Sequence, residues 1–211
     1  MKRAFTLIEL LIVVAIIGIL AAIAVPNFLN AQLKAKIART QADMRNISSS
    51  IQMFTMDKNV MLLDFWDDDA PSALTRWEDN FKCVGPKPPY TTFEGPFYPL
   101  TSPVSYMSSL PQDPFSPREQ NVGFGANEQG RGYIYFDNEP GGGEDHGIGL
   151  YTSANAPAYN LRALRDKEFG LISIGPDGAM GIGRNPGSLR GLPYDSTNGL
   201  ISDGDLVRLG S

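Results

Sequence analysis

The 211-residue chain is poor in the side chains that build most metal and redox sites, with one cysteine and one histidine. Cys83 alone cannot form an intrachain disulfide, and a buried, unreactive thiol is its simplest interpretation. His146 alone cannot build a multi-histidine metal site, and its glycine-rich surroundings indicate an exposed loop. A complete P-loop, dinucleotide fingerprint or Gly-x-Ser-x-Gly elbow is also missing. These absences predict a protein that is not an enzyme, with a membrane-anchored enzyme as the weak alternative.

Glycine and proline are scarce in the first part of the chain. All but one of the 22 glycines and all but one of the 16 prolines follow residue 58. Because both residues disfavour helix interiors, the first part is predicted to be helical and the rest to consist of loops and short strands. The net charge of −5 does not support the basic surface that nucleic-acid binding requires, so nucleic acid is not an expected partner.

An apolar run extends from Phe5 to Val25, and Glu9 is its only charged residue. A helix of this length, at about 1.5 Å per residue, covers the ~30 Å hydrocarbon core of a bilayer. Lys2 and Arg3 precede the run. The positive-inside rule therefore predicts a single-pass protein with a cytoplasmic N-terminus and an extracytoplasmic remainder.

Two general interpretations of this run leave Glu9 unexplained. A cleaved secretory signal would use the small residues of Ala22–Ala24, but the helical pattern continues beyond that point. A plain membrane anchor explains the length of the run. It gives no role to a carboxylate in the apolar segment, where ionised groups are expensive and usually functional.

A third interpretation comes from residues 2–11, which read KRAFTLIELL. This segment resembles the prepilin signature of type IV pilins and pseudopilins, with alanine where the family usually has glycine before the cleavage point. The resemblance implies a leader of residues 1–4, cleavage between Ala4 and Phe5 by a prepilin peptidase, and N-methylation of Phe5. Residues 5–26 would then remain as a transmembrane helix that becomes the filament core.

The same resemblance gives Glu9 a role in assembly. A buried carboxylate is tolerable when a positive group neutralises it, and in pilin-like filaments the acid is thought to meet the new Phe5 amine of a neighbouring subunit. Gly18 and Pro26 weaken the helix and are candidate bending points. Loosening of the helix between them in the filament is a hypothesis.

Residues 27–58 are predicted to continue the helix in amphipathic form. Apolar positions recur at spacings of three and four, which places one stripe on a helix face. The stripe consists of Leu33, Ile37, Thr40, Met44, Ile47, Ile51 and Phe54. Packing on the chain's own head is expected, because a coiled-coil seam would be only about three heptads long.

Residues 59–211 are predicted to form one globular α+β head. Short β-prone runs at 133–136, 169–174 and 206–209 are bounded by turn residues, which predicts a small antiparallel sheet packed against the amphipathic helix. Residues 59–100 are irregular and are most simply a packed surface loop, with a partner-binding face as the alternative. The acidic cluster at 64–69 within this region is most simply a solvated surface.

A second resemblance lies in the head. Residues 110–115 (LPQDPF) with the following strand, residues 173–178 (SIGPDG) and residues 202–206 (SDGDL) are similar, in order, to elements of the major pseudopilin of type II secretion. Phe115 stands where that family has tryptophan, and two stretches near 60–105 and 154–168 are insertions.

The resemblance also implies a calcium ion bound by an acidic loop. The candidate ligands are Asp177, Asp195, Asp203 and Asp205, and calcium prefers six to eight oxygen ligands on such turn-rich segments. The alternative is that these aspartates only stabilise turns, as Asp-Gly pairs commonly do.

The two resemblances therefore imply a subunit of a type II secretion pseudopilus in the bacterial inner membrane, with a periplasmic or extracytoplasmic head. Expected partners are further copies, minor pilin-like subunits, the prepilin peptidase and the inner-membrane assembly platform. A type IV pilin of a surface pilus, serving adhesion, motility or DNA uptake, is the main alternative. Such pilins often close a C-terminal loop with two cysteines, and this chain has one.

Overall fold

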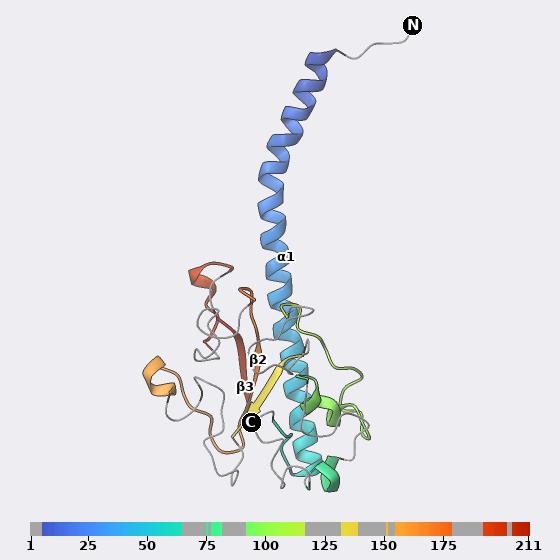
Figure 1. The fold of residues 1–211 in the computed structure, drawn as a ribbon, viewed down its shortest axis with the longest axis vertical. Coiled ribbons are helices and arrows are strands. Elements are labelled where there is room, and N and C mark those ends of the chain that lie inside the picture. Colours follow the sequence, from blue (N-terminus) through green and yellow to red (C-terminus); the bar gives the residue numbers. More distant parts are fainter. Residues whose placement is uncertain are drawn as a thin grey trace.

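One helix, α1 (Leu7–Lys58), dominates the computed structural model, which describes residues 6–64, 75, 77–81, 92–116, 132–138, 151, 155–178, 192–201 and 204–211. Its first half extends away from the head, and its second half lies along the head (Figure 1). Thr6 caps the start, and Asn59 ends the helix in the left-handed conformation at φ 54°. The predicted helix of 5–58 is thus confirmed from residue 7, and Pro26 lies inside it without ending it.

The head is built from short elements separated by loops. The strands are β1 (Ile134–Asp137), β2 (Phe169–Ser173) and β3 (Leu206–Gly210). Short helical turns are η1 (Trp77–Phe81), η2 (Gly95–Leu100), η4 (Ala156–Tyr159) and η5 (Ser196–Asn198). All three predicted strands are confirmed within one or two residues. Together with α1 they form the predicted α+β fold.

The three strands form one antiparallel sheet in the order β1-β2-β3. In its register Phe136 pairs with Gly170, and Phe169 pairs with Gly210. A Cβ built on Gly170 would lie 2.1 Å from Cζ of Phe136, and one on Gly210 would lie 2.4 Å from Cζ of Phe169. Each glycine therefore makes room for the aromatic ring opposite it.

The main core lies between α1 and the sheet. The predicted stripe is buried from Thr40 to Phe54, while Leu33 and Ile37, nearer the first half of α1, are only partly buried. These side chains meet Tyr135, Leu171 and other residues from the helix-facing side of the sheet. The amphipathic segment thus packs on its own head, as its spacing predicts.

A second core covers the opposite side of the sheet. Alternate strand residues such as Ile134, Phe136 and Ile172 pack there with Phe93, Tyr151 and Leu164 from loops. The first two strands of the sheet are therefore buried on both sides, whereas the sequence predicts cover only from the amphipathic helix. The reason is that loop residues supply the additional apolar cover.

Candidate assembly site

The first half of α1 presents an apolar surface with no cover from the head. Its most apolar 18-residue window has a mean hydropathy of 3.0, and none of that window is buried. Large apolar side chains are exposed from Leu7 to Leu29. A Cβ added to Gly18 would have no heavy atom within 4 Å, so this position is open as well. By length and composition the helix can cross a membrane.

Glu9 lies in the first turn of this apolar helix, and Thr6 satisfies its carboxylate. Oε2 of Glu9 accepts hydrogen bonds from the backbone N–H of Thr6 at 2.9 Å and from its hydroxyl at 2.8 Å. The hydroxyl oxygen of Thr6 in turn accepts the N–H of Glu9 at 3.2 Å, which completes a capping box. Cleavage before Phe5 would leave this arrangement intact, because Thr6 would follow Phe5 in the processed chain.

The segment 110–115 is fastened to the end of β2 through Asp113. Its carboxylate accepts the backbone N–H of Phe115 at 2.9 Å and that of Ile174 at 3.2 Å. Burial raises the pKa of Asp113, and hydrogen bonds from Phe115, Ser173 and Ile174 oppose that shift. This aspartate therefore has a structural role, since it connects the loop to the sheet.

Three loops meet beside the start of β3, where two of the predicted calcium ligands lie. Asp177 accepts a hydrogen bond from the backbone N–H of Gly204 at 3.4 Å. Asp205, the residue after Gly204, is fully buried. The backbone N–H of Asp205 donates to the carbonyl of Leu192 at 2.6 Å. Asp205 also lies near Tyr151, whose pKa rises to about 12 because of burial and this neighbouring carboxylate.

The other two predicted calcium ligands are placed differently. Asp195 is exposed, and its carboxylate accepts the N–H of Thr197 at 2.8 Å at the start of η5. That bond and one from the Thr197 side chain lower the pKa of Asp195. Asp203 lies outside the described residues. Across the described ranges, no group of three or more acidic, histidine or cysteine side chains could hold a metal ion.

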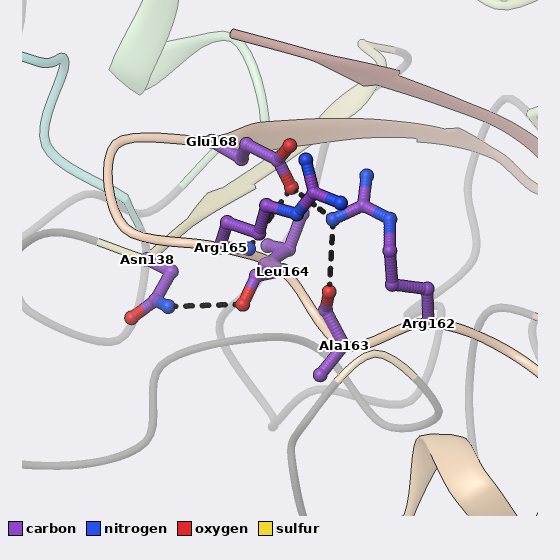
Figure 2. Close-up of polar contacts among 6 residues, drawn as sticks. All are labelled: Asn138, Arg162, Ala163, Leu164, Arg165 and Glu168. Atoms are coloured by element: carbon purple, nitrogen blue, oxygen red, sulfur yellow. Dashed lines mark hydrogen bonds and ion pairs between the residues drawn. The ribbon is translucent and has the colours of Figure 1, made fainter.

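The loop between β1 and β2 carries a buried acidic anchor, Glu168 (Figure 2). Its Oε2 accepts a hydrogen bond from Nη1 of Arg162 at 2.5 Å and another from the backbone N–H of Arg165 at 2.9 Å. The bond from Arg162 is the main reason that the pKa of Glu168 is lowered, and burial opposes it. The amide of Asn138 adds a bond to the carbonyl of Leu164 at 3.1 Å. This loop is thus held against the sheet.

Comparison with known proteins finds similar sequences among pilins and secretion proteins. Residues 1–25 match the model of the prokaryotic N-terminal methylation motif. The chain is 47% identical over 58 residues to the type IV major pilin protein PilA of Myxococcus xanthus, which covers 28% of this chain and 26% of that protein. It is 29% identical over 152 residues to the type II secretion system core protein G of Klebsiella michiganensis, which covers 72% and 94%.

The chain resembles type IV pilin-like proteins. The comparison with core protein G carries more weight than that with PilA, because it covers 72% of this chain and 94% of that protein. A core protein G of Pectobacterium carotovorum is 31% identical over 114 residues, which covers 54% of this pilin-like chain and 62% of that protein. The match to PilA spans about a quarter of PilA and is confined to a short segment. No solved structure matches significantly.

Several sites predicted for this pilin-like chain remain predictions. Ala4 and Phe5 lie outside the described residues, so cleavage, methylation and pairing of the Phe5 amine with Glu9 stay untested. The structure places Gly18 and Pro26 within a continuous α1. The role of Thr6 was missed, although the spacing Thr-x-x-Glu is a readable capping-box signal.

Proposed function

We propose that this pilin-like chain is a structural subunit of a type II secretion pseudopilus, which polymerises through α1 to drive protein export. The observation that carries the proposal is the combination of an uncovered apolar helix with a similarity to core protein G that covers 72% of the chain. Polymerisation is physically sensible because the apolar surface of α1, once out of the bilayer, needs a new apolar environment. Stacking against other copies of α1 provides it.

Processing and topology belong to the same proposal. Prepilin peptidase would cut between Ala4 and Phe5, and the new Phe5 amine would be methylated. Lys2 and Arg3 would keep the N-terminus in the cytoplasm while α1 crosses the inner membrane and the head faces the periplasm. The matching methylation motif and the membrane-compatible length of α1 support this arrangement.

In the assembled filament, the carboxylate of Glu9 would gain a second partner. In the single chain its carboxylate is satisfied by Thr6 within the same helix turn. A carboxylate offers lone pairs for more than two hydrogen bonds, so the Phe5 amine of a neighbour can add to the Thr6 contacts. Pairing of these opposite charges would select the register between subunits. Minor pilin-like subunits and the inner-membrane platform are the other expected partners.

A surface pilus is the second candidate function. The observation in its favour is the higher identity to PilA, 47%, over a segment of 58 residues. That segment is shared by both kinds of filament and therefore does not distinguish them. The extensive match to core protein G favours the pseudopilus.

The function is tested by deleting the gene and measuring exoprotein release and surface motility in the same strain. We expect release to be lost and motility to be retained, with rescue by the wild-type chain and not by Glu9→Gln. Mass spectrometry of the native chain should find N-methylated Phe5. Intact release with lost motility would assign the chain to a surface pilus, and a native chain beginning at Val25 would indicate an exported soluble protein.

Calcium binding in the head is a separate part of the proposal. Asp177 and Asp205 would be its carboxylate ligands, with Asp203 as a third, and backbone carbonyls on these turns could complete the coordination. The supporting observations are that Asp177 contacts Gly204 and that Asp205 is a fully buried carboxylate. A bound cation would offset the cost of burying that charge. Asp195 fits less well, because it is exposed and caps η5.

Thermal melting of the full chain in detergent tests this binding. A ligand at about 100 times its Kd stabilises by about 2.7 kcal/mol, and each kcal/mol raises Tm by about 2–4 °C in a chain of this size. We expect Tm to rise with calcium relative to chelator, and to rise less in Asp177→Asn. Asp166→Asn, at an exposed acid elsewhere, is the matched control. Equal Tm values in calcium and chelator would remove the site.

A further inference from the structure

A groove of about 380 Å³ runs between α1 and β3 on the head. Gln41, Met44 and Arg45 line it from the helix, and residues 206–209 line it from the strand. Consecutive side chains of a strand point to opposite faces. Because four consecutive residues of β3 border the groove, the groove runs along the edge of the strand.

This edge of β3 is available for hydrogen bonding. The sheet order places β3 at one side, and in the described part of the chain it pairs only with β2. An edge strand carries a row of backbone N–H and C=O groups that can pair with another extended segment. Addition of a strand is a common way to bind a peptide, with side-chain pockets supplying the specificity.

Two arginines flank the groove. Arg208 pairs with Leu171, whose side chain is in the helix-facing core, so Arg208 projects on the side of α1. Arg45 is exposed on α1 across from it. Within the described ranges neither arginine forms an ion pair. Guanidinium groups bind carboxylates with paired, charge-assisted hydrogen bonds, so the groove is suited to an acidic extended segment.

The chain itself contains such a segment. Residues 65–69 read Phe-Trp-Asp-Asp-Asp, which combines two aromatic residues with the longest acidic run in the sequence. The segment follows the head-side end of α1 at Lys58, whereas Arg45 lies 13 residues earlier, about 20 Å back along the helix axis. A filament of parallel α1 helices that are staggered along their axes would let this segment of one copy reach the groove of another.

We infer that the groove between α1 and β3 binds the acidic segment 65–69 of a second copy of the chain. The acidic residues meet Arg45 and Arg208, and the backbone of the segment adds to the free edge of β3. This contact between heads rests on the filament function proposed above. It would give the filament a polar, specific interaction between heads in addition to the apolar contacts of α1.

Cysteine cross-linking in assembled filaments tests the contact directly. Two tagged chains are co-expressed in a Cys83→Ser background, one carrying Arg208→Cys and the other Asp68→Cys. We expect mild oxidation of sheared filaments to give a disulfide-linked dimer that carries both tags. Arg165→Cys, at an exposed arginine in the loop before β2, replaces Arg208→Cys as the control and should give little dimer. Equal yields from the two pairs would overturn the inference.

Charge reversal provides an independent test. Arg45→Glu with Arg208→Glu should lower filament yield several-fold, and Asp67→Lys with Asp68→Lys in the same chain should restore it. Arg165→Glu should leave the yield unchanged. Restoration cannot result from misfolding, because it needs two further substitutions in a distant segment. Normal filament yield in the double arginine variant would overturn the contact and leave the proposed function standing.

Two other outcomes separate the possibilities. A wild-type chain that forms no filaments under secretion conditions would overturn the proposed function, and this inference with it. Normal filaments without the cross-link, combined with lost exoprotein release in the arginine variant, would assign the groove to an exported protein instead of a second copy.

Discussion

Single carboxylates in this molecule take their roles from the backbone that surrounds them. Glu9 is an obvious candidate in the sequence because it is the only charge in an apolar run. Glu168 is not, because its partner Arg162 is six residues away in an irregular loop and nothing in the spacing predicts their contact. Asp113 was recognised only as part of a family-like segment, and its bonds to Phe115 and Ile174 depend on the folded sheet.

Substituting Glu168 by glutamine should make the stability of the head less sensitive to acid. The pKa of Glu168 is lowered in the folded chain, mainly by Arg162, so the unfolded chain binds the proton more readily. The stabilisation is present above the unfolded pKa of about 4.3 and is lost as pH falls through the lower folded pKa. Urea unfolding of the detergent-solubilised chain at pH 7 and pH 3 measures this difference.

The matched variant for that experiment is Arg162→Gln. It removes the cationic partner that is the main cause of the lowered pKa of Glu168. Both variants should lose less free energy of unfolding between pH 7 and pH 3 than the wild type does. A loss as large as that of the wild type in both variants would contradict the assigned role of the ion pair.

At the scale of elements, the periodicity of apolar residues predicts a helix or strand well where the pattern repeats over many residues. The helix was predictable because its apolar stripe and its lack of glycine agree over many turns. The strands were found from short β-prone runs, but their register depends on contacts between distant residues. The second core was missed because Phe93, Tyr151 and Leu164 come from loops whose sequences carry no periodic signal.

The glycines of the sheet give an element-scale prediction, that Gly170→Ala destabilises the head by about 1–3 kcal/mol. The added Cβ would lie 2.1 Å from Cζ of Phe136, and that ring is fully buried and cannot move aside freely. Denaturant unfolding measures the loss. Phe136→Leu shortens the opposing side chain. In that background Gly170→Ala should lower the free energy of unfolding by less, as a double-mutant cycle would reveal. Simple additivity of the two substitutions would argue against this clash.

The whole molecule has two parts with different environments. From Leu7 to Leu29 the apolar side chains of α1 are exposed, whereas the stripe that faces the head is partly buried at Leu33 and Ile37 and buried from Thr40 to Phe54. The first part therefore contributes nothing to the head core. Its apolar surface needs a membrane or other copies of the chain, while the second part is the central helix of an independent α+β unit.

This division predicts that a chain of residues 30–211 folds as a soluble monomer and cannot assemble. All of the buried side chains of α1 are retained, so the near-ultraviolet circular dichroism and the Tm should match those of the head in the full chain. Light scattering after gel filtration measures the mass. A chain of residues 47–211 is the contrasting variant, because it removes Thr40 and Met44 from the core. It should be insoluble or strongly destabilised, and equal stability of the two truncated chains would show that the core does not depend on this stretch of α1.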